Sequence, residues 1–435
     1  MQRTITLFFV LIMSTLLNAS NSWAPVVMGD ITTFVPYKTT TQPPVPEPDN
    51  SILLSSGNAQ SGVADRGTYS YYKMYAHAGE RIHIDLYNQD ANGNLYVKVG
   101  SKASKENYDC KSENGGETHS KENDSCSLLV DRDSFVYIAV HAPTYGCYSN
   151  VQHTVMAYKG DYGVKGPYEV LQYDSANTRS YYPKNLDKSP IVIFLPGWSD
   201  NTFDTLVKHD KLLRHIASQG YTVITKLSGT TMDEHFNVDF SDVLNLISTH
   251  SSDLDTERVG VIGWSHGGGL SFSMMRELVN AGYGTKGRFI MPIEPMFAIG
   301  MNQQYMHQLN NMNFVMMRFE SLEEDPRTNF VEYKLLDGEN IDKNYINLEK
   351  HEHDYLKNVP KPFSKPMDAL MAYTLKDDQD AHDIALEGAG KENPKNVETP
   401  LDTGSYGTSC TTSNYWANDK VESVVNDIDY CAEVY

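Results

Sequence analysis

The sequence predicts an α/β protein with a mostly parallel sheet, preceded by a small all-β sandwich. Residues from about 51 to 160 contain β-type runs between turn clusters, and no helical period competes with them. From about Gly166 onward, buried-type β runs alternate with helical segments, which is typical of a largely parallel sheet with helical connections. The length of 435 residues agrees with this division, because domains contain roughly 150 residues each.

The composition excludes several classes of protein. Asp and Glu number 56 against 36 Lys and Arg, which gives a net charge of -20. This acidity argues against binding to nucleic acid or anionic lipid, because both need a basic face. The 28 Tyr and 15 Phe exclude a chain that is disordered throughout, and the modest Gly and Pro content excludes a collagen-like chain.

The first 24 residues have the pattern of a secretory signal peptide. Arg3 precedes an apolar run over residues 7–17, and small residues follow as far as Ala24. The run is shorter than the roughly 20 residues that span a bilayer, and no later segment has the length and apolarity of a transmembrane helix. We therefore expect an exported protein, either periplasmic or released from the cell. Residues 25–50 follow as a linker, because their prolines favour an extended spacer.

The five cysteines agree with export, since an oxidising compartment permits disulfides. Cys110 with Cys126 and Cys410 with Cys431 are the natural local pairs, which leaves Cys147 over. The chain contains no Cys-x-x-Cys and no His/Cys cluster that indicates zinc. We expect the protein to need neither a metal nor an organic cofactor.

The predicted sandwich covers residues 51–160. Its aromatic residues have two interpretations: Tyr71, Tyr72 and Tyr96 could stack on a ligand, or they could fill the core. Aromatic residues at β spacing more often pack in a core, so we favour the second interpretation. The strands expected here are Tyr69–Tyr75, Arg81–Tyr87, Leu95–Val99, Phe135–His141 and His153–Tyr158.

This segment resembles the bacterial pre-peptidase C-terminal domain, a secreted β-sandwich. The resemblance covers nearly the whole segment and is carried by HAGERIHIDLYNQDANGNLYVKVG, YDC, SC, FVYIAVHAP and HTVMAY. Asn94 is a departure, since the family usually has Asp there. The resemblance implies a companion domain of a secreted hydrolase, with a role in folding or in binding a polymer or surface.

The second predicted domain covers residues 161–435. Helical segments fall between its β runs, for example His209–Gln219 and Val238–Thr249. The strands expected here are Ile191–Leu195, Tyr221–Lys226, Val259–Gly263, Phe289–Ile293, Phe314–Phe319 and Asn344–Leu348.

One strand–turn–helix carries the chemistry. Residues 259–270 read VGVIGWSHGGGL and contain a G-x-S-x-G pattern centred on Ser265. A serine between a strand end and a helix start sits in a tight turn, and its neighbours must lack Cβ atoms so that strand and helix can approach. The pattern alone is weak, but here an apolar β run precedes it and a helical segment follows. We therefore predict that Ser265 is a nucleophile, with a Gly-rich structural turn as the alternative.

A serine hydroxyl needs a base to take its proton. In α/β enzymes with such a strand–serine–helix turn, the catalytic residues follow one another along the chain as Ser, acid and His. The base should therefore follow the last strand. His351 and His353 occupy that place, in LEKHEHDYL. We favour His353 as the base and interpret His351 as a solvated loop residue or a neighbour of the base.

The acid should follow the strand Phe314–Phe319, where several carboxylates compete. Counting from the start of the strand favours Glu323, and counting backward from the next helix favours Glu320. Asp325 ranks third, because it precedes a proline and could simply start that helix. The acid would hold the imidazole in the right tautomer and stabilise the imidazolium.

Two backbone amides should bind the oxyanion. The residue after the nucleophile, His266, supplies one of them. The second should come from the loop after the earlier strand, in Leu195-Pro196-Gly197-Trp198, where the Trp198 N–H is the candidate.

From Gly166 onward the chain resembles the secreted bacterial cutinases and polyester hydrolases, within the wider dienelactone-hydrolase and platelet-activating-factor acetylhydrolase group. The matches are GPYEV, SYYP, IVIFLPGW, HIASQGYTVIT, TERVGVIGWSHGGG, MPIEP and NYINLEKHEH. The resemblance implies an α/β-hydrolase fold, supports Ser265 and His353, and places Trp198 and His266 at the oxyanion hole. Cys410 and Cys431 would mirror the terminal disulfide of the cutinases.

Two departures bear on the substrate. Met296 follows Pro295 where the cutinases have a Trp that contacts aromatic polyester, so Met296 is the candidate substrate contact. Trp264 precedes the nucleophile where the usual residue is His. The resemblance therefore supports ester hydrolysis more than it supports cutin or polyester as the substrate.

The sequence thus predicts an exported serine hydrolase that cleaves carboxylic esters through an acyl-enzyme. Its substrate would be a small or a polymeric ester. Two alternatives remain, namely a secreted serine peptidase of the same fold and a non-catalytic binding protein that keeps the fold.

Overall fold

The computed structural model describes residues 49–114, 122–144, 148–319, 326–348 and 351–387. By its contacts the chain divides into two compact units, residues 1–50 and 51–435, and all the described strands and helices belong to the second. The predicted signal peptide and nearly all of the linker lie outside the described residues. So do Cys147, Cys410 and Cys431.

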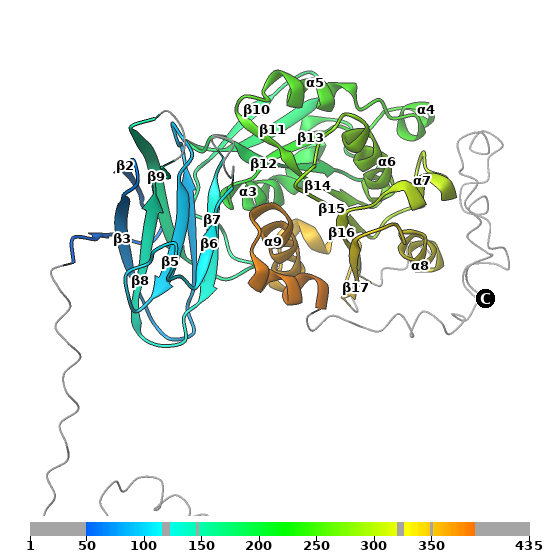
Figure 1. Ribbon diagram of the computed structural model, residues 1–435. Coiled ribbons are helices and arrows are strands. Elements are labelled where there is room, and N and C mark those ends of the chain that lie inside the picture. Colours follow the sequence, from blue (N-terminus) through cyan, green and yellow to red (C-terminus); the bar gives the residue numbers. More distant parts are fainter. Residues whose placement is uncertain (1–48, 115–121, 145–147, 320–325, 349–350, 388–435) are drawn as a thin grey trace, which may run out of the picture. The chain divides into compact units, whose positions relative to one another are not determined.

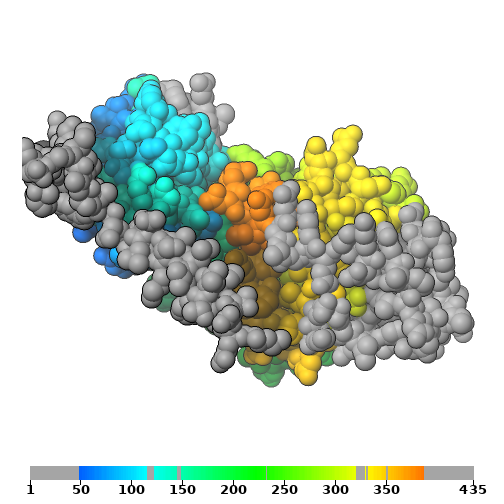
Figure 2. All heavy atoms as spheres, turned by 90° about the horizontal axis from the view of Figure 1, so that it is seen from below, coloured from blue at the N-terminus to red at the C-terminus, as the bar shows by residue number. Residues whose placement is uncertain are grey.

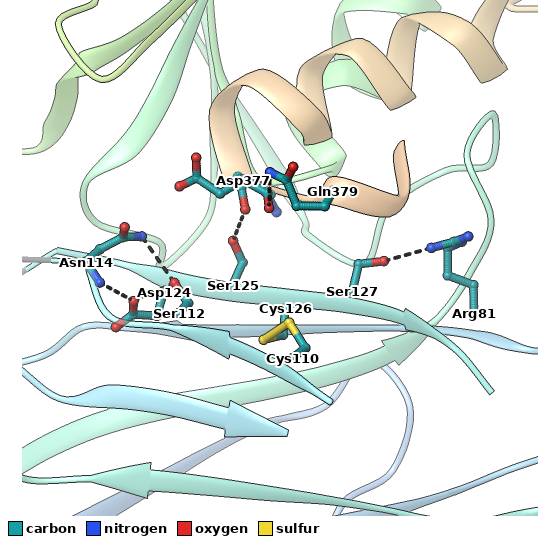
Figure 3. Close-up of a disulfide and its surroundings, with 11 residues drawn as sticks. Arg81, Cys110, Ser112, Asn114, Asp124, Ser125, Cys126, Ser127, Asp377 and Gln379 are labelled. Carbon is teal, nitrogen blue, oxygen red and sulfur yellow. Dashed lines mark hydrogen bonds between the residues drawn. A yellow bond between two sulfur atoms is a disulfide. The ribbon is translucent and has the colours of Figure 1, made fainter. Parts of the chain in front are cut away.

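The N-terminal part of the second unit is a pair of sheets (Figure 1). On β3, Tyr72, Met74 and Ala76 are buried while the residues between them are not, because successive side chains point to opposite faces of a strand. A disulfide joins Cys110 to Cys126 and confirms the predicted pair (Figure 3). The first sheet has the order β1 (Ile52–Leu53), β3 (Tyr69–Ala76), β8 (Ser134–His141), β5 (Asn94–Val99), β6 (Cys110–Ser112), and the second β2 (Ala59–Asp65), β9 (Asn150–Lys159), β4 (Arg81–Tyr87), β7 (Asp124–Leu129).

The tyrosines of this part divide between the core and the outside. Tyr72 is fully buried and Tyr96 is 2% exposed, as expected of residues that fill the interior. Tyr71, by contrast, is only partly buried.

The remaining strands form one eight-stranded sheet. From β12 to β17 every pairing is parallel, whereas β10 pairs with β11, and β11 with β13, in the antiparallel sense. The order is β10 (Val170–Asp174), β11 (Thr178–Pro183), β13 (Thr222–Lys226), β12 (Ser189–Leu195), β14 (Leu254–Trp264), β15 (Gly287–Ile293), β16 (Met312–Arg318), β17 (Ile341–Asn347).

The predicted fold class, an α/β-hydrolase with a mostly parallel sheet plus a small sandwich, is wrong. Strands make up 36% of the structure and helices 26%, and the three sheets are mixed or antiparallel. The prediction gave too little weight to the strands before residue 160 and missed the hairpin β10–β11. Such a short connection between strands forces antiparallel pairing, because a parallel pair needs a long crossover.

Helices cover both faces of the eight-stranded sheet (Figure 1). On β12, Ile191 and Ile193 pack in one core with α5 (Ser241–Thr249) and α6 (His266–Asn280), while Val192 and Phe194 pack in a second core with α3 (Asp210–Ser218) and α9 (Lys361–Lys376). The helices are α2 (Phe203–Leu206), η1 (Val207–His209), α3 (Asp210–Ser218), α4 (Met232–Phe236), α5 (Ser241–Thr249), α6 (His266–Asn280), α7 (Gln303–Gln308), α8 (Pro326–Leu335), η2 (Tyr355–Asn358), α9 (Lys361–Lys376), η3 (Gln379–Ala381) and η4 (Asp383–Glu387).

The two N-terminal sheets share one core and are called the sandwich from here on; polar contacts connect them to α9. Ser125 Oγ donates to the Lys376 carbonyl at 3.3 Å, and Lys376 Nζ lies 3.2 Å from the Asp85 carboxylate. In the space-filling view the atoms near the end of α9, drawn in orange, reach the surface beside the cyan atoms of the sandwich (Figure 2). None of the helices in the described ranges combines the length and apolarity needed to cross a membrane.

Candidate active site

Ser265 occupies a strained turn between β14 and α6. Its backbone has φ 56° and ψ -118°, a conformation that non-glycine residues rarely adopt and that costs about 1–3 kcal/mol. The Ser265 amide donates to the Ile293 carbonyl at 2.9 Å, and its own carbonyl accepts from the amides of Gly269 and Met296. These bonds hold the turn, and they leave the half-buried serine at the C-terminal edge of the sheet.

The glycines of the motif are required by packing. A Cβ atom on Gly263 would lie 2.1 Å from the Gly267 carbonyl oxygen, and one on Gly267 would lie 2.0 Å from the Leu195 carbonyl oxygen. Both distances are far inside van der Waals contact. Only glycine therefore lets β14, α6 and β12 approach as closely as they do.

His353 lies in the loop that follows β17. Its Nδ1 atom is 3.6 Å from Glu294 Oε2, and its side chain is 11% exposed. The indole N–H of Trp264 donates to the His353 carbonyl at 2.8 Å. His351 is placed differently, because its ring stacks on Tyr355 with 3.7 Å between the centroids.

Glu294 is the residue that the sequence analysis missed. Its carboxylate is fully buried, accepts a hydrogen bond from the Phe319 amide and lies 3.8 Å from Arg318 Nε. Its backbone φ is 43°, so Glu294 shares with Ser265 a conformation that is rare outside glycine. The predicted acids Glu320 and Glu323 lie outside the described residues, as does Asp325.

The sheet register explains why Glu294 lies beside the nucleophile. Trp264 on β14 pairs with Ile293 on β15, so the next residues, Ser265 and Glu294, leave the sheet side by side. The sequence does carry one signal, since a charged residue stands directly between a buried strand and Pro295. That signal has no meaning until the two strands are known to be neighbours.

Trp198 and His266, the predicted oxyanion residues, lie together. The centroid of the Trp198 ring lies 5.0 Å from that of the His266 ring. The Trp198 ring also stacks on the His235 ring, with 3.7 Å between their centroids. His266 is the first residue of α6, where backbone N–H groups have no partner within the helix and the helix dipole favours negative charge. Burial lowers the pKa of the His266 imidazole to about 4, so it is neutral at pH 7.

Met296, the predicted substrate contact, is 4% exposed and belongs to the apolar core. Its amide donates to the Ser265 carbonyl at 3.1 Å, so its backbone supports the turn.

A cavity of about 360 Å³ lies beside His266, the residue after Ser265. It is lined by Leu195, Pro196 and His266 together with polar side chains from the segment after β13. Across the described ranges, no group of three or more His, Cys, Asp or Glu residues is arranged to hold a metal ion.

Comparisons with known proteins give one partial similarity. No family model matches the chain. A stretch of 109 residues is 27% identical to alkaline serine exoprotease A of Vibrio alginolyticus, which corresponds to 25% of this chain and 19% of that protein. The chain therefore spans about one fifth of the length of this curated relative.

Proposed function

We propose that this protein is a serine hydrolase that cleaves carboxylic esters through an acyl-enzyme intermediate. The observation that carries the proposal is the strained backbone of Ser265 at the start of α6, with the buried Glu294 at the end of the neighbouring strand β15 and His353 in the loop after β17. A strained serine between a buried strand and a helix is the arrangement that exposes a nucleophilic hydroxyl. The similarity to a serine exoprotease agrees with the broader class of serine hydrolase.

In the proposed mechanism Ser265 Oγ attacks the ester carbonyl while His353 takes the hydroxyl proton. Glu294 orients the imidazole through Nδ1 and stabilises the imidazolium. The amides of His266 and Trp198 would bind the developing oxyanion, and each such donor contributes about 2.7–4 kcal/mol of transition-state stabilisation. His353 then gives its proton to the leaving alkoxide. Water, activated by the same imidazole, releases the acid and restores the serine.

Peptide hydrolysis is the second candidate, and the exoprotease similarity favours it. The same residues would act on an amide, with His353 protonating a leaving amine.

We further propose that the protein is exported, on the basis of the signal-like residues 1–24. Binding of a polymer or surface by the sandwich is also a proposal, supported by the partly exposed tyrosines on β3.

The test compares wild type with Ser265→Ala on nitrophenyl esters from acetate to palmitate and on peptide anilides. We expect ester turnover that falls by at least about 10³-fold in the variant, because the nucleophile is lost. A fluorophosphonate should label the wild type and leave Ser265→Ala unlabelled. Turnover of anilides alone would favour the peptidase, and an unlabelled, inactive wild type would favour the binding protein.

A further inference from the structure

We propose that Trp264 is a positioning residue for His353. Its indole N–H ties the loop that carries the imidazole to the turn that carries Ser265. The inference rests on the proposed function, because it assigns His353 the role of base. It goes beyond that function by naming the residue that sets the relative position of nucleophile and base.

The tie joins two segments that are far apart in the chain. Trp264 is covalently next to Ser265, and its Nε1–H donates to the His353 carbonyl at 2.8 Å across 89 residues of sequence. The two rings are also in contact, with 5.0 Å between their centroids. A displacement of the indole would therefore move the serine turn and the histidine loop relative to each other.

The indole itself has little freedom to move. Trp264 is 5% exposed, and its ring packs so closely on Gly197 that a Cβ atom there would lie 2.7 Å from the indole. On another side, the ring of the buried His209 lies 5.1 Å away. Gly197 precedes Trp198, so the indole also contacts the loop that would supply the second oxyanion amide.

Two ammonium groups complete the surroundings of the ring. Lys208 Nζ and Lys357 Nζ lie 5.3 Å and 5.5 Å from its centroid, within the range of cation–π attraction. Lys357 belongs to η2, directly after the His353 loop, and Lys208 belongs to η1. The indole thus contacts the Gly197 loop, the His353 loop, η1 and η2, while its N–H makes one directed bond, to His353.

The decisive variant is Trp264→Phe, which keeps one aromatic ring but removes the N–H donor together with part of the buried volume of the indole. A typical hydrogen bond predicts a fall in kcat of about two- to tenfold with KM little changed. The rate constant for fluorophosphonate labelling should fall by the same factor, because the reagent reacts with the same serine. Phe289→Leu is the matched control, since Phe289 is a fully buried ring in the core shared with Trp264.

The outcomes separate positioning from simple packing. We expect Trp264→Phe to lose activity and labelling rate at a Tm where Phe289→Leu retains both. Unchanged kcat and labelling in Trp264→Phe, or equal losses in the two variants at equal Tm, would overturn the proposal. A wild type that the reagent does not label would instead overturn the proposed function, and the role of Trp264 with it.

A second measurement needs no substitution at Trp264. The indole N–H of wild type, assigned by elimination with Trp23→Phe, Trp198→Phe and Trp416→Phe, should exchange slowly with deuterated solvent, because it is buried and bonded. Fast exchange would contradict the bond to His353.

Discussion

The sandwich and the strand ends of the eight-stranded sheet are organised in opposite ways. In the sandwich, side chains alternate between core and outside, and a disulfide stabilises the pair of sheets. At the strand ends, Ser265 and Glu294 both have positive φ, and a buried carboxylate faces a histidine. Backbone strain persists where the surrounding structure enforces it, and it clusters at functional sites. On the proposed function, the strand ends of the eight-stranded sheet carry the chemistry, while the sandwich is stabilised by its core and its disulfide.

The largest expected effect tests whether the strand ends carry the chemistry. In Glu294→Gln, kcat should fall by about 10³–10⁴-fold, because the amide no longer stabilises the imidazolium or fixes its tautomer. Steady-state kinetics on a nitrophenyl ester measures the change, with circular dichroism to confirm folding.

The matched controls are Glu320→Gln and Glu323→Gln, the acids that the sequence analysis favoured. We expect both to keep wild-type kcat. A large loss in either one, together with an active Glu294→Gln, would return the acid to the segment after β16.

The second effect concerns the sandwich alone. Replacing both Cys110 and Cys126 by Ser should lower the free energy of unfolding by about 3 kcal/mol, the amount typical of a loop of this length. Urea denaturation measures the change, and Cys147→Ser serves as a control that leaves the pair intact. Because the pair lies in the sandwich, kcat per folded molecule should stay unchanged; a large fall in kcat would show that the two regions are coupled.

The smallest effect, taken per pH unit, is a pH dependence that arises next to the disulfide. Burial raises the pKa of Asp124 to about 8, although its Oδ1 accepts from Ser112 Oγ at 2.6 Å and from the Asn114 amide at 2.8 Å (Figure 3). The folded state therefore holds a proton that the unfolded state releases near pH 4. Between about pH 4 and pH 8 this group lowers stability by roughly 1 kcal/mol per pH unit as the pH rises.

Asp124→Asn should remove that slope, because an amide imitates the protonated carboxyl. The difference in unfolding free energy between variant and wild type should grow from pH 4 to pH 8. Asp109→Asn should instead lower stability by a constant amount above pH 4 and lose that effect as the pH falls below 4, since the contacts of Asp109 with Lys98 and the Val99 amide lower the pKa of that carboxyl. Parallel curves for wild type and Asp124→Asn would contradict the shifted pKa.

Short stretches of sequence predict the strands of the second domain and one disulfide, because each of these features depends on residues that are close together in the chain. The C-terminal ends of the six runs predicted in the second domain lie within one residue of the ends of β12–β17, whereas most of the runs begin later than the strands do. The ends agree because buried strands appear as short apolar segments between breakers. The pair Cys110–Cys126 was found because its members are close in sequence. The overall class was wrong, because runs of strands and helices were counted without knowing that β10 and β11 fold back as a hairpin.

The sequence by itself determined the strained turn at Ser265, because strand, glycines and helix are contiguous and each obeys a local steric rule. It also indicated the loop of His353. Only the tertiary structure decided which carboxylate faces that histidine. The register of β14 against β15 sets Glu294 beside Ser265, and no local pattern encodes which strands become neighbours. The bond from Trp264 to His353 is of the same kind, since it joins residues that only the folded sheet brings together.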